Sequence, residues 1–247
     1  MSLTVMAVLL VLATLQQLVA PVFLNPFRGS HAQMRAQSDT LIEPAGYAFA
    51  IWGPIYLLAL GYAGLQLFPD ANTGSVFDRV APWAIALYLS STLWLFLALR
   101  KLYWLTVPLL AAMALFASVA LVSLVSGSDG TLLWWGLAIA PFGLYAGWTI
   151  AATAVNISSV ASRVGFKRFG LSQVAFDIAL LIGATLATLI VLWLTRGEIS
   201  LVATTLWALL AIVVSSRRQK ESPLILLACA VAAVLVFAAA MGLSLGA

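Results

Sequence analysis

The hydrophobic positions of this chain form long unbroken runs instead of the short alternation that is typical of soluble elements. Cutting the sequence at charges, prolines and glycines leaves eight such runs, each apolar on all sides. A helix needs ~20 apolar residues to cross a bilayer, whereas the strands of a membrane barrel read as ~10-residue alternating stretches. The pattern therefore predicts eight transmembrane helices, at about 3–23, 45–68, 81–99, 102–125, 131–157, 171–194, 199–215 and 223–245.

Composition strengthens this interpretation. Of the 247 residues, 64% are hydrophobic and 8% are charged, against about a quarter charged in soluble domains. Lipid can cover such a surface and water cannot, so the predicted fold class is an all-α integral membrane protein. The first run is also compatible with a signal peptide, but Leu18-Val19-Ala20 is a poor cleavage site and no basic segment precedes it. A retained helix is favoured.

The basic residues indicate an orientation. Ten of the twelve lie in alternate connectors, and only Arg79 and Arg196 lie in the others. The positive-inside rule then places both termini outside and the basic connectors in the cytoplasm, and we expect a bacterial cytoplasmic membrane. Because the charges sit in short connectors, the net charge of +4 does not indicate a nucleic-acid partner. The ten are Arg28, Arg35, Arg100, Lys101, Arg163, Lys167, Arg168, Arg217, Arg218 and Lys220.

Residues for most kinds of catalysis are missing from the sequence. The single histidine, His31, has no cysteine or histidine at metal-ligand spacing, and the single cysteine, Cys229, lies inside an apolar run. No glycine-rich phosphate loop with a lysine occurs. We therefore predict no catalytic residues, no metal site and no enzymatic activity.

A group of aromatic and polar residues is predicted to share one membrane depth. With a helix rise of ~1.5 Å per residue, four different spans bring side chains to about 10 Å from the basic boundary, or to a similar depth. They are Trp52, Trp94, Asn156 and Asp177, with Tyr56, Ser90, Ser91 and Thr92 close to the same depth and Trp148 somewhat deeper. An aromatic cavity with a few polar groups is the usual form of a small-molecule site, and connector 24–44 is long enough to cover it. Ordinary helix packing is the alternative. The candidate ligand-binding residues are Trp52, Tyr56, Trp94, Trp148 and Asn156.

Asp177 is the one ionisable residue well inside a predicted span. A carboxylate in the membrane should face the bundle interior and have a partner, such as Gln173 one turn earlier. Two roles are possible for this carboxylate. It contacts a ligand or a proton, or it makes a structural hydrogen bond or ion pair that joins the sixth span to the rest of the bundle. Two small-residue stripes predict close helix contacts, within the monomer or at a dimer seam. They are Gly143-x-x-x-Gly147-x-x-x-Ala151 and Ala175, Ala179, Gly183 and Ala187.

The second span opens with a motif. Pro44 leads through Phe49 to Trp52-Gly53-Pro54-Ile55-Tyr56, which resembles the tryptophan-rich sensory protein family, relatives of the translocator protein (TspO). In the fifth span, Trp148, Thr153 and Asn156 match the spacing of that family's fifth helix. The sequence departs from the pattern at Tyr47, where the family usually has tryptophan. It also departs in the third span, where Ser90-Ser91-Thr92-Leu93-Trp94 replaces an asparagine near tryptophans.

The resemblance covers about residues 1–160 and implies a five-helix bundle there, with residues 161–247 adding three further transmembrane helices. It also implies a pocket inside the bundle that binds porphyrins or, in some members, sterol-like ligands, with the first connector as its lid. Any metal would then be held by the porphyrin and not by protein ligands. A bound porphyrin or lipid-like molecule is thus the only cofactor that we expect.

Three functions follow from these observations. The first is a non-enzymatic receptor, sensor or transporter for a planar hydrophobic ligand such as a tetrapyrrole. The second is an accessory or assembly subunit of a larger membrane complex, docked through the last three spans. The third, a secondary transporter with Asp177 as a proton site, predicts an inverted repeat that the sequence does not show. The expected partners are membrane lipids, a hydrophobic small molecule, and a second copy or a larger complex.

Overall fold

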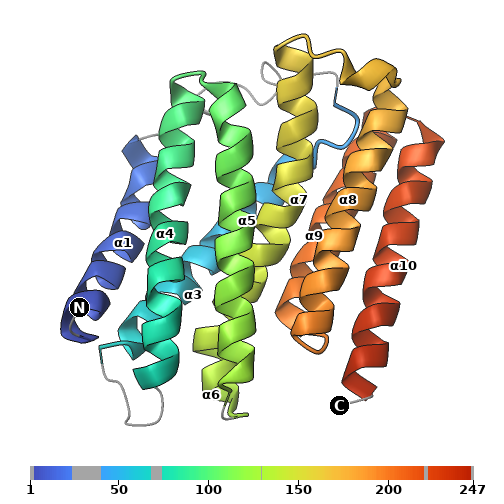
Figure 1. Cartoon of the computed structure of the whole chain (residues 1–247). Helices are drawn as coiled ribbons and strands as arrows, with labels where there is room; N and C mark the ends of the chain where they lie inside the picture. Colours follow the sequence, from blue (N-terminus) through green and yellow to red (C-terminus); the bar gives the residue numbers. More distant parts are fainter. Residues whose placement is uncertain (1–2, 24–39, 68–73, 129, 220–221, 246–247) are drawn as a thin grey trace.

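A computed structural model describes residues 3–23, 40–67, 74–128, 130–219 and 222–245. Within these ranges the chain is helical, with no strand, and eight helices are long and apolar enough to cross a membrane. The predicted number of spans is therefore confirmed. Figure 1 shows the helices standing side by side, with the described residues beginning and ending at the same end of the bundle.

The eight spans are built from the following elements. The first two are α1 (Leu3–Phe23) and the 3₁₀ turn η1 (Gly46–Ile51) followed by α3 (Trp52–Leu65). The next two are α4 (Gly74–Leu99) and α5 (Tyr103–Ser126). The fifth joins α6 (Leu132–Trp134), the π-helical turn η2 (Trp135–Ile139) and α7 (Ala140–Arg163). After the 3₁₀ turn η3 (Arg168–Gly170) come α8 (Gln173–Leu194), α9 (Ile199–Gln219) and α10 (Pro223–Leu245).

The helix α7 lies at the centre of the molecule. It contacts α3 and α5 on one side and α8 and α9 on the other, while α10 packs against α8 and α9 (Figure 1). In the fifth span, 72% of the most apolar stretch is buried inside the protein, and in the seventh span 61% is buried. The corresponding share is 22–39% in the other six spans. The first five spans therefore join the last three through α7, which packs against both α8 and α9.

Small residues permit this central contact. A Cβ atom on Gly143 would lie 1.9 Å from the Ser200 Oγ of α9, and one on Gly147 would lie 3.0 Å from the Leu201 carbonyl oxygen. The predicted stripe on the fifth span thus packs within the monomer, as expected. The stripe on α8 differs, because a Cβ on Gly183 would meet nothing within 4 Å.

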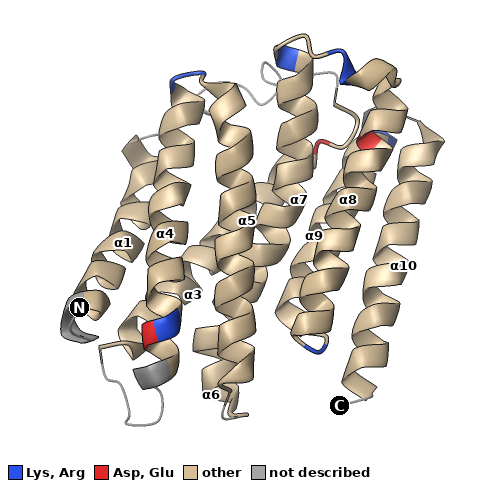
Figure 2. Cartoon of the chain, in the orientation of Figure 1, with Lys and Arg blue, Asp and Glu red and all other residues tan. Residues whose placement is uncertain are grey.

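Charged side chains gather at the ends of the helices (Figure 2). Among the described residues, the α4–α5 and α7–α8 connectors carry Arg100, Lys101, Lys167 and Arg168. All four lie at the same end of the bundle, where the described segment that begins at residue 40 also starts. Arg28, Arg35, Lys220 and His31 lie outside the described residues.

Candidate functional site

A cavity, called the pocket below, lies between the first five spans and α9. Its volume is about 430 Å³, within the usual range for small-molecule sites. The wall is formed by α3, α4, α5 and α7, closed by the segment before η1 and by Ala208 and Ile212 of α9. Six aromatic side chains contribute to it, namely Phe49, Trp52, Tyr56, Trp94, Tyr103 and Trp148.

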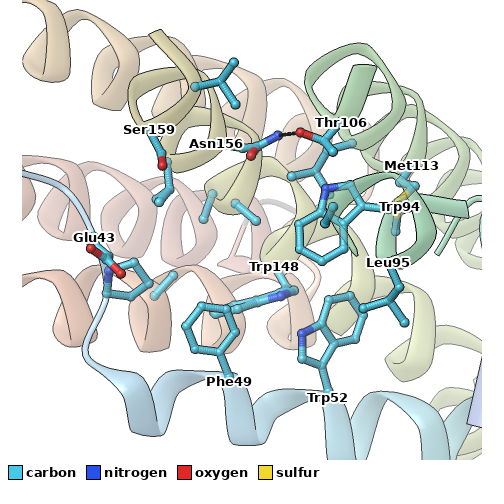
Figure 3. A pocket seen from close by; sticks show the side chains of 18 of the residues that line it. Glu43, Phe49, Trp52, Trp94, Leu95, Thr106, Met113, Trp148, Asn156 and Ser159 are labelled. Atoms are coloured by element: carbon cyan, nitrogen blue, oxygen red, sulfur yellow. Dashed lines mark hydrogen bonds between the residues drawn. The ribbon is translucent and has the colours of Figure 1, made fainter. Parts of the chain in front are cut away.

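The five candidate ligand-binding residues all line this pocket, and so does Ser91, whereas Asp177, Ser90 and Thr92, which were predicted at a similar depth, do not. Three helices supply the five candidates: Trp52 and Tyr56 come from α3, Trp94 from α4, and Trp148 and Asn156 from α7. Figure 3 shows the labelled tryptophans and Asn156 arranged around one space. The structure therefore brings the five candidates together, although their contact with a ligand remains a prediction.

The tryptophans form two walls that meet at a steep angle. The rings of Trp52 and Trp148 lie 6.3 Å apart at 83°, and Phe49 meets Trp148 edge to face at 5.6 Å (Figure 3). Behind them, Trp52 packs on Tyr145, which is fully buried. Edge-to-face pairs contribute about 0.5–1.5 kcal/mol beyond area burial, so this arrangement holds the rings in place without any ligand.

Polar groups occupy a different part of the wall. The Asn156 amide nitrogen donates a hydrogen bond of 2.9 Å to the Thr106 hydroxyl, which in turn donates to the Tyr103 carbonyl oxygen (Figure 3). This chain of bonds fixes the Asn156 side chain against α5. The two charged residues of the wall, Glu43 and Arg163, come from the segment before η1 and from the last turn of α7.

Residues 40–48, called the strap below, cross from the first connector into η1 and carry part of the pocket wall. Four hydrogen bonds tie the strap to α8 and α9, and each uses a main-chain atom of the strap. The Leu41 amide donates to Asp177, and the Leu41 carbonyl accepts from Ser216. Farther along, the Ala45 amide donates to the Ala211 carbonyl, and the Trp207 indole donates to the Ala48 carbonyl.

Asp177 lies beside the strap and not in the pocket wall. Its carboxylate is fully buried and accepts hydrogen bonds from the Leu41 amide at 2.8 Å, Gln173 at 2.9 Å and the Ser158 hydroxyl at 2.5 Å. It thereby links the strap, α7 and α8. This geometry matches the structural alternative predicted for Asp177, including its partner Gln173.

Comparison with known families decides the identity of the chain. A family model described as TSPO-like protein matches residues 2–242. The chain belongs to the TSPO-like protein family. The match extends past the motifs of the first five spans and includes most of α8, α9 and α10. Together with the eight spans, membership establishes a multi-pass membrane protein. No curated protein and no solved structure matches the chain.

For this family member, sequence reasoning missed part of the pocket wall. Thr106 stands six residues after Arg100, or about 9 Å along α5, so the depth argument applied to α5 would have found it; Tyr103 lies closer to the boundary and would not have been found. Ala208 and Ile212 give no such signal, because they are ordinary apolar residues in an apolar helix. Only the packing of α9 against α7 reveals that the seventh span borders the pocket.

The described part of this TSPO-like chain shows no cluster of side chains that could bind a metal ion. No three His, Cys, Asp or Glu side chains gather there as a metal ion would require. Cys229 is buried in an apolar cluster of α8, α9 and α10, away from the pocket wall.

Proposed function

We propose that this TSPO-like protein binds a planar hydrophobic ligand of the tetrapyrrole class in the pocket, as a non-enzymatic receptor, sensor or transporter. The observation that carries the proposal is the convergence of Trp52, Trp94 and Trp148 on one cavity of about 430 Å³. Flat conjugated molecules suit such walls, because stacking on aromatic rings adds to the free energy of area burial. The porphyrin ligands implied by the family resemblance are molecules of this kind.

The test is a titration of the purified protein with protoporphyrin IX, followed by the absorption of the porphyrin itself. This signal does not depend on tryptophan fluorescence, so tryptophan variants can be compared directly. We expect saturable binding that weakens at least tenfold in Trp52→Ala, since aromatic anchors in buried pockets typically contribute about 2 kcal/mol or more. A titration of empty detergent micelles measures the partition of free porphyrin.

The matched control is Trp193→Ala. Trp193 is 69% exposed at the end of α8 and does not line the pocket. We expect wild-type affinity in this variant. If binding were not saturable, or if Trp52→Ala and Trp193→Ala bound equally well, the pocket would not be the ligand site.

We also infer that the two termini face outward and that the strap end of the pocket lies toward the cytoplasm, because the basic connectors gather at that end. Single cysteines in a Cys229→Ala background test this orientation in intact cells. Val164→Cys, in the exposed connector after α7, should resist a membrane-impermeant maleimide, whereas Ser128→Cys after α5 should react. The reverse pattern would contradict the inferred orientation.

The second candidate function is a subunit of a larger membrane complex. It is favoured by the small residues Ala175, Ala179 and Gly183, which are exposed along α8 and would let another helix approach closely. Purification in mild detergent distinguishes the two functions. A stoichiometric protein partner that is lost in Gly183→Leu would favour the subunit function, and a lone protein with saturable porphyrin binding would favour the receptor.

A further inference from the structure

A second, smaller cavity lies beside the pocket, between α7, α8 and α9, and is called the side cavity below. Its volume is about 20 Å³, enough for about one methyl-sized or water-sized group. All three helices contribute to its wall, which includes Ile150, Ala154, Leu181, Thr185, Thr205 and Leu209.

The wall of the side cavity is mostly aliphatic, and two of its hydroxyl groups are already engaged. The Thr185 hydroxyl donates a hydrogen bond of 2.7 Å to the Leu181 carbonyl oxygen, and the Thr205 hydroxyl donates one of 2.9 Å to the Leu201 carbonyl oxygen. A buried water needs two to four polar partners, roughly, whereas a hydrocarbon group needs none. The side cavity therefore suits an apolar group.

Two residues line both cavities and separate them, namely Ala151 of α7 and Ile212 of α9. Ala151 lies one helical turn after Gly147, on the face of α7 that packs against α9. Because the side chain of Ala151 is a single methyl group, most of the partition is the side chain of Ile212, which is 2% exposed.

We propose that Ile212 is a specificity-determining residue that limits how far the apolar substituents of a ligand extend from the pocket toward α8. This inference rests on the proposed function and narrows its ligand class. The pocket accepts a planar molecule whose edge toward α9 carries short substituents such as vinyl or ethyl groups. Longer alkyl arms on that edge meet Ile212, although an apolar space lies directly behind it.

Two truncations on α9 separate this role from a general loosening of the core. Ile212→Ala removes three carbon atoms from the partition, and because packed cores relax only partly around such a change, the pocket and the side cavity become one space. Leu209→Ala also removes three carbon atoms from a buried side chain, one turn earlier on the same helix. Leu209 lines the side cavity but not the pocket, so this variant enlarges the side cavity and leaves the partition in place.

The experiment compares protoporphyrin IX with the dipropyl ether of haematoporphyrin IX, in which a 1-propoxyethyl arm replaces each vinyl group. The two molecules share the macrocycle and both propionate groups, so they differ in the size of two apolar arms. Each is titrated into the wild-type protein, Ile212→Ala and Leu209→Ala, and binding is followed by porphyrin absorption. Titrations of empty micelles correct for the partition of each porphyrin into detergent.

We expect the wild-type protein and Leu209→Ala to bind protoporphyrin IX at least tenfold more tightly than the ether, since apolar pockets discriminate roughly tenfold or more for each methylene group that does not fit. In Ile212→Ala the preference should fall below about threefold, because the arm enters the side cavity. If Ile212→Ala failed to fold, Ile212→Val, which removes one carbon atom, should reduce the preference in the same direction by about twofold or more.

Three results would overturn the inference and leave the proposed function standing. They are equal binding of the two porphyrins by the wild-type protein, an unchanged preference in the Ile212 variants, and an equal loss of preference in Leu209→Ala. The absence of saturable protoporphyrin IX binding to the wild-type protein would overturn the proposed function as well.

Discussion

Replacing Asp177 by alanine tests whether the strap is held by this carboxylate. The substitution removes an acceptor that is fully buried and receives three hydrogen bonds, from the Leu41 amide, Gln173 and Ser158. Hydrogen bonds to charged groups contribute about 1.5–3 kcal/mol each, but the cost of burying the charge offsets part of this sum.

The magnitude follows from which donors lose their partner. Gln173 Nε2 also donates to the Ser158 hydroxyl at 3.1 Å, so these two side chains keep a contact with each other. The Leu41 amide donates to Asp177 alone among the described residues, so it becomes a partly buried donor without an acceptor. We therefore expect Asp177→Ala to lower the free energy of unfolding by about 3 kcal/mol.

The assay is thermal unfolding in detergent, with Asp177→Asn and Asp78→Ala for comparison. A loss of about 3 kcal/mol corresponds to a melting temperature about 6–12 °C lower for a chain of this length. Asp177→Asn keeps one acceptor oxygen and should lose about 1 kcal/mol. Asp78 is exposed on α4, so Asp78→Ala should be neutral. If Asp177→Ala unfolded within about 1 °C of Asp78→Ala, the carboxylate would not be structural, and the proton-contact hypothesis would gain weight.

Two further predictions concern α9. Gly143→Ala should lower the free energy of unfolding by about 1–3 kcal/mol because its Cβ would collide with the Ser200 hydroxyl; Gly183→Ala, which meets nothing within 4 Å, should be neutral or slightly stabilising in the same thermal assay. Trp207→Phe removes one hydrogen bond to the strap and should raise the porphyrin dissociation rate about fivefold in stopped-flow measurements. A rate equal to that of Trp193→Phe would show that the strap does not control release.

The span count was predictable because bilayer thickness fixes the length of an apolar run. The residues at which the helices begin and end were harder to predict. The third span was predicted to begin at residue 81, but α4 begins at Gly74 and includes Asp78, Arg79 and Pro82. Likewise α9 continues through Arg217 to Gln219. Charges mark the edge of the hydrocarbon layer, whereas the helix itself continues into the headgroup region, where water and lipid headgroups solvate them.

The pocket was predictable only in part, and the reason is geometric. Sequence position gives depth along a helix, and depth placed Trp52, Trp94 and Asn156 at compatible levels. It does not give the neighbours of a helix, so the contribution of Ala208 on α9 was missed. The proposed lid was predicted over connector 24–44; residues 24–39 lie outside the described residues, and residues 40–44 belong to the strap.

The strap has a consequence for how this protein can change. It is held at Leu41, Ala45 and Ala48 by main-chain atoms, and its side chains take no part in those four bonds. Substitutions at strap positions that face the pocket can therefore alter what the pocket accepts while these four main-chain bonds remain. The helices α8 and α9 tolerate less variation at Asp177, Trp207 and Ser216, because the side chains of these residues make hydrogen bonds to the strap. Ligand preference can thus evolve, or be engineered, on one segment while a separate pair of helices preserves the shape of the site.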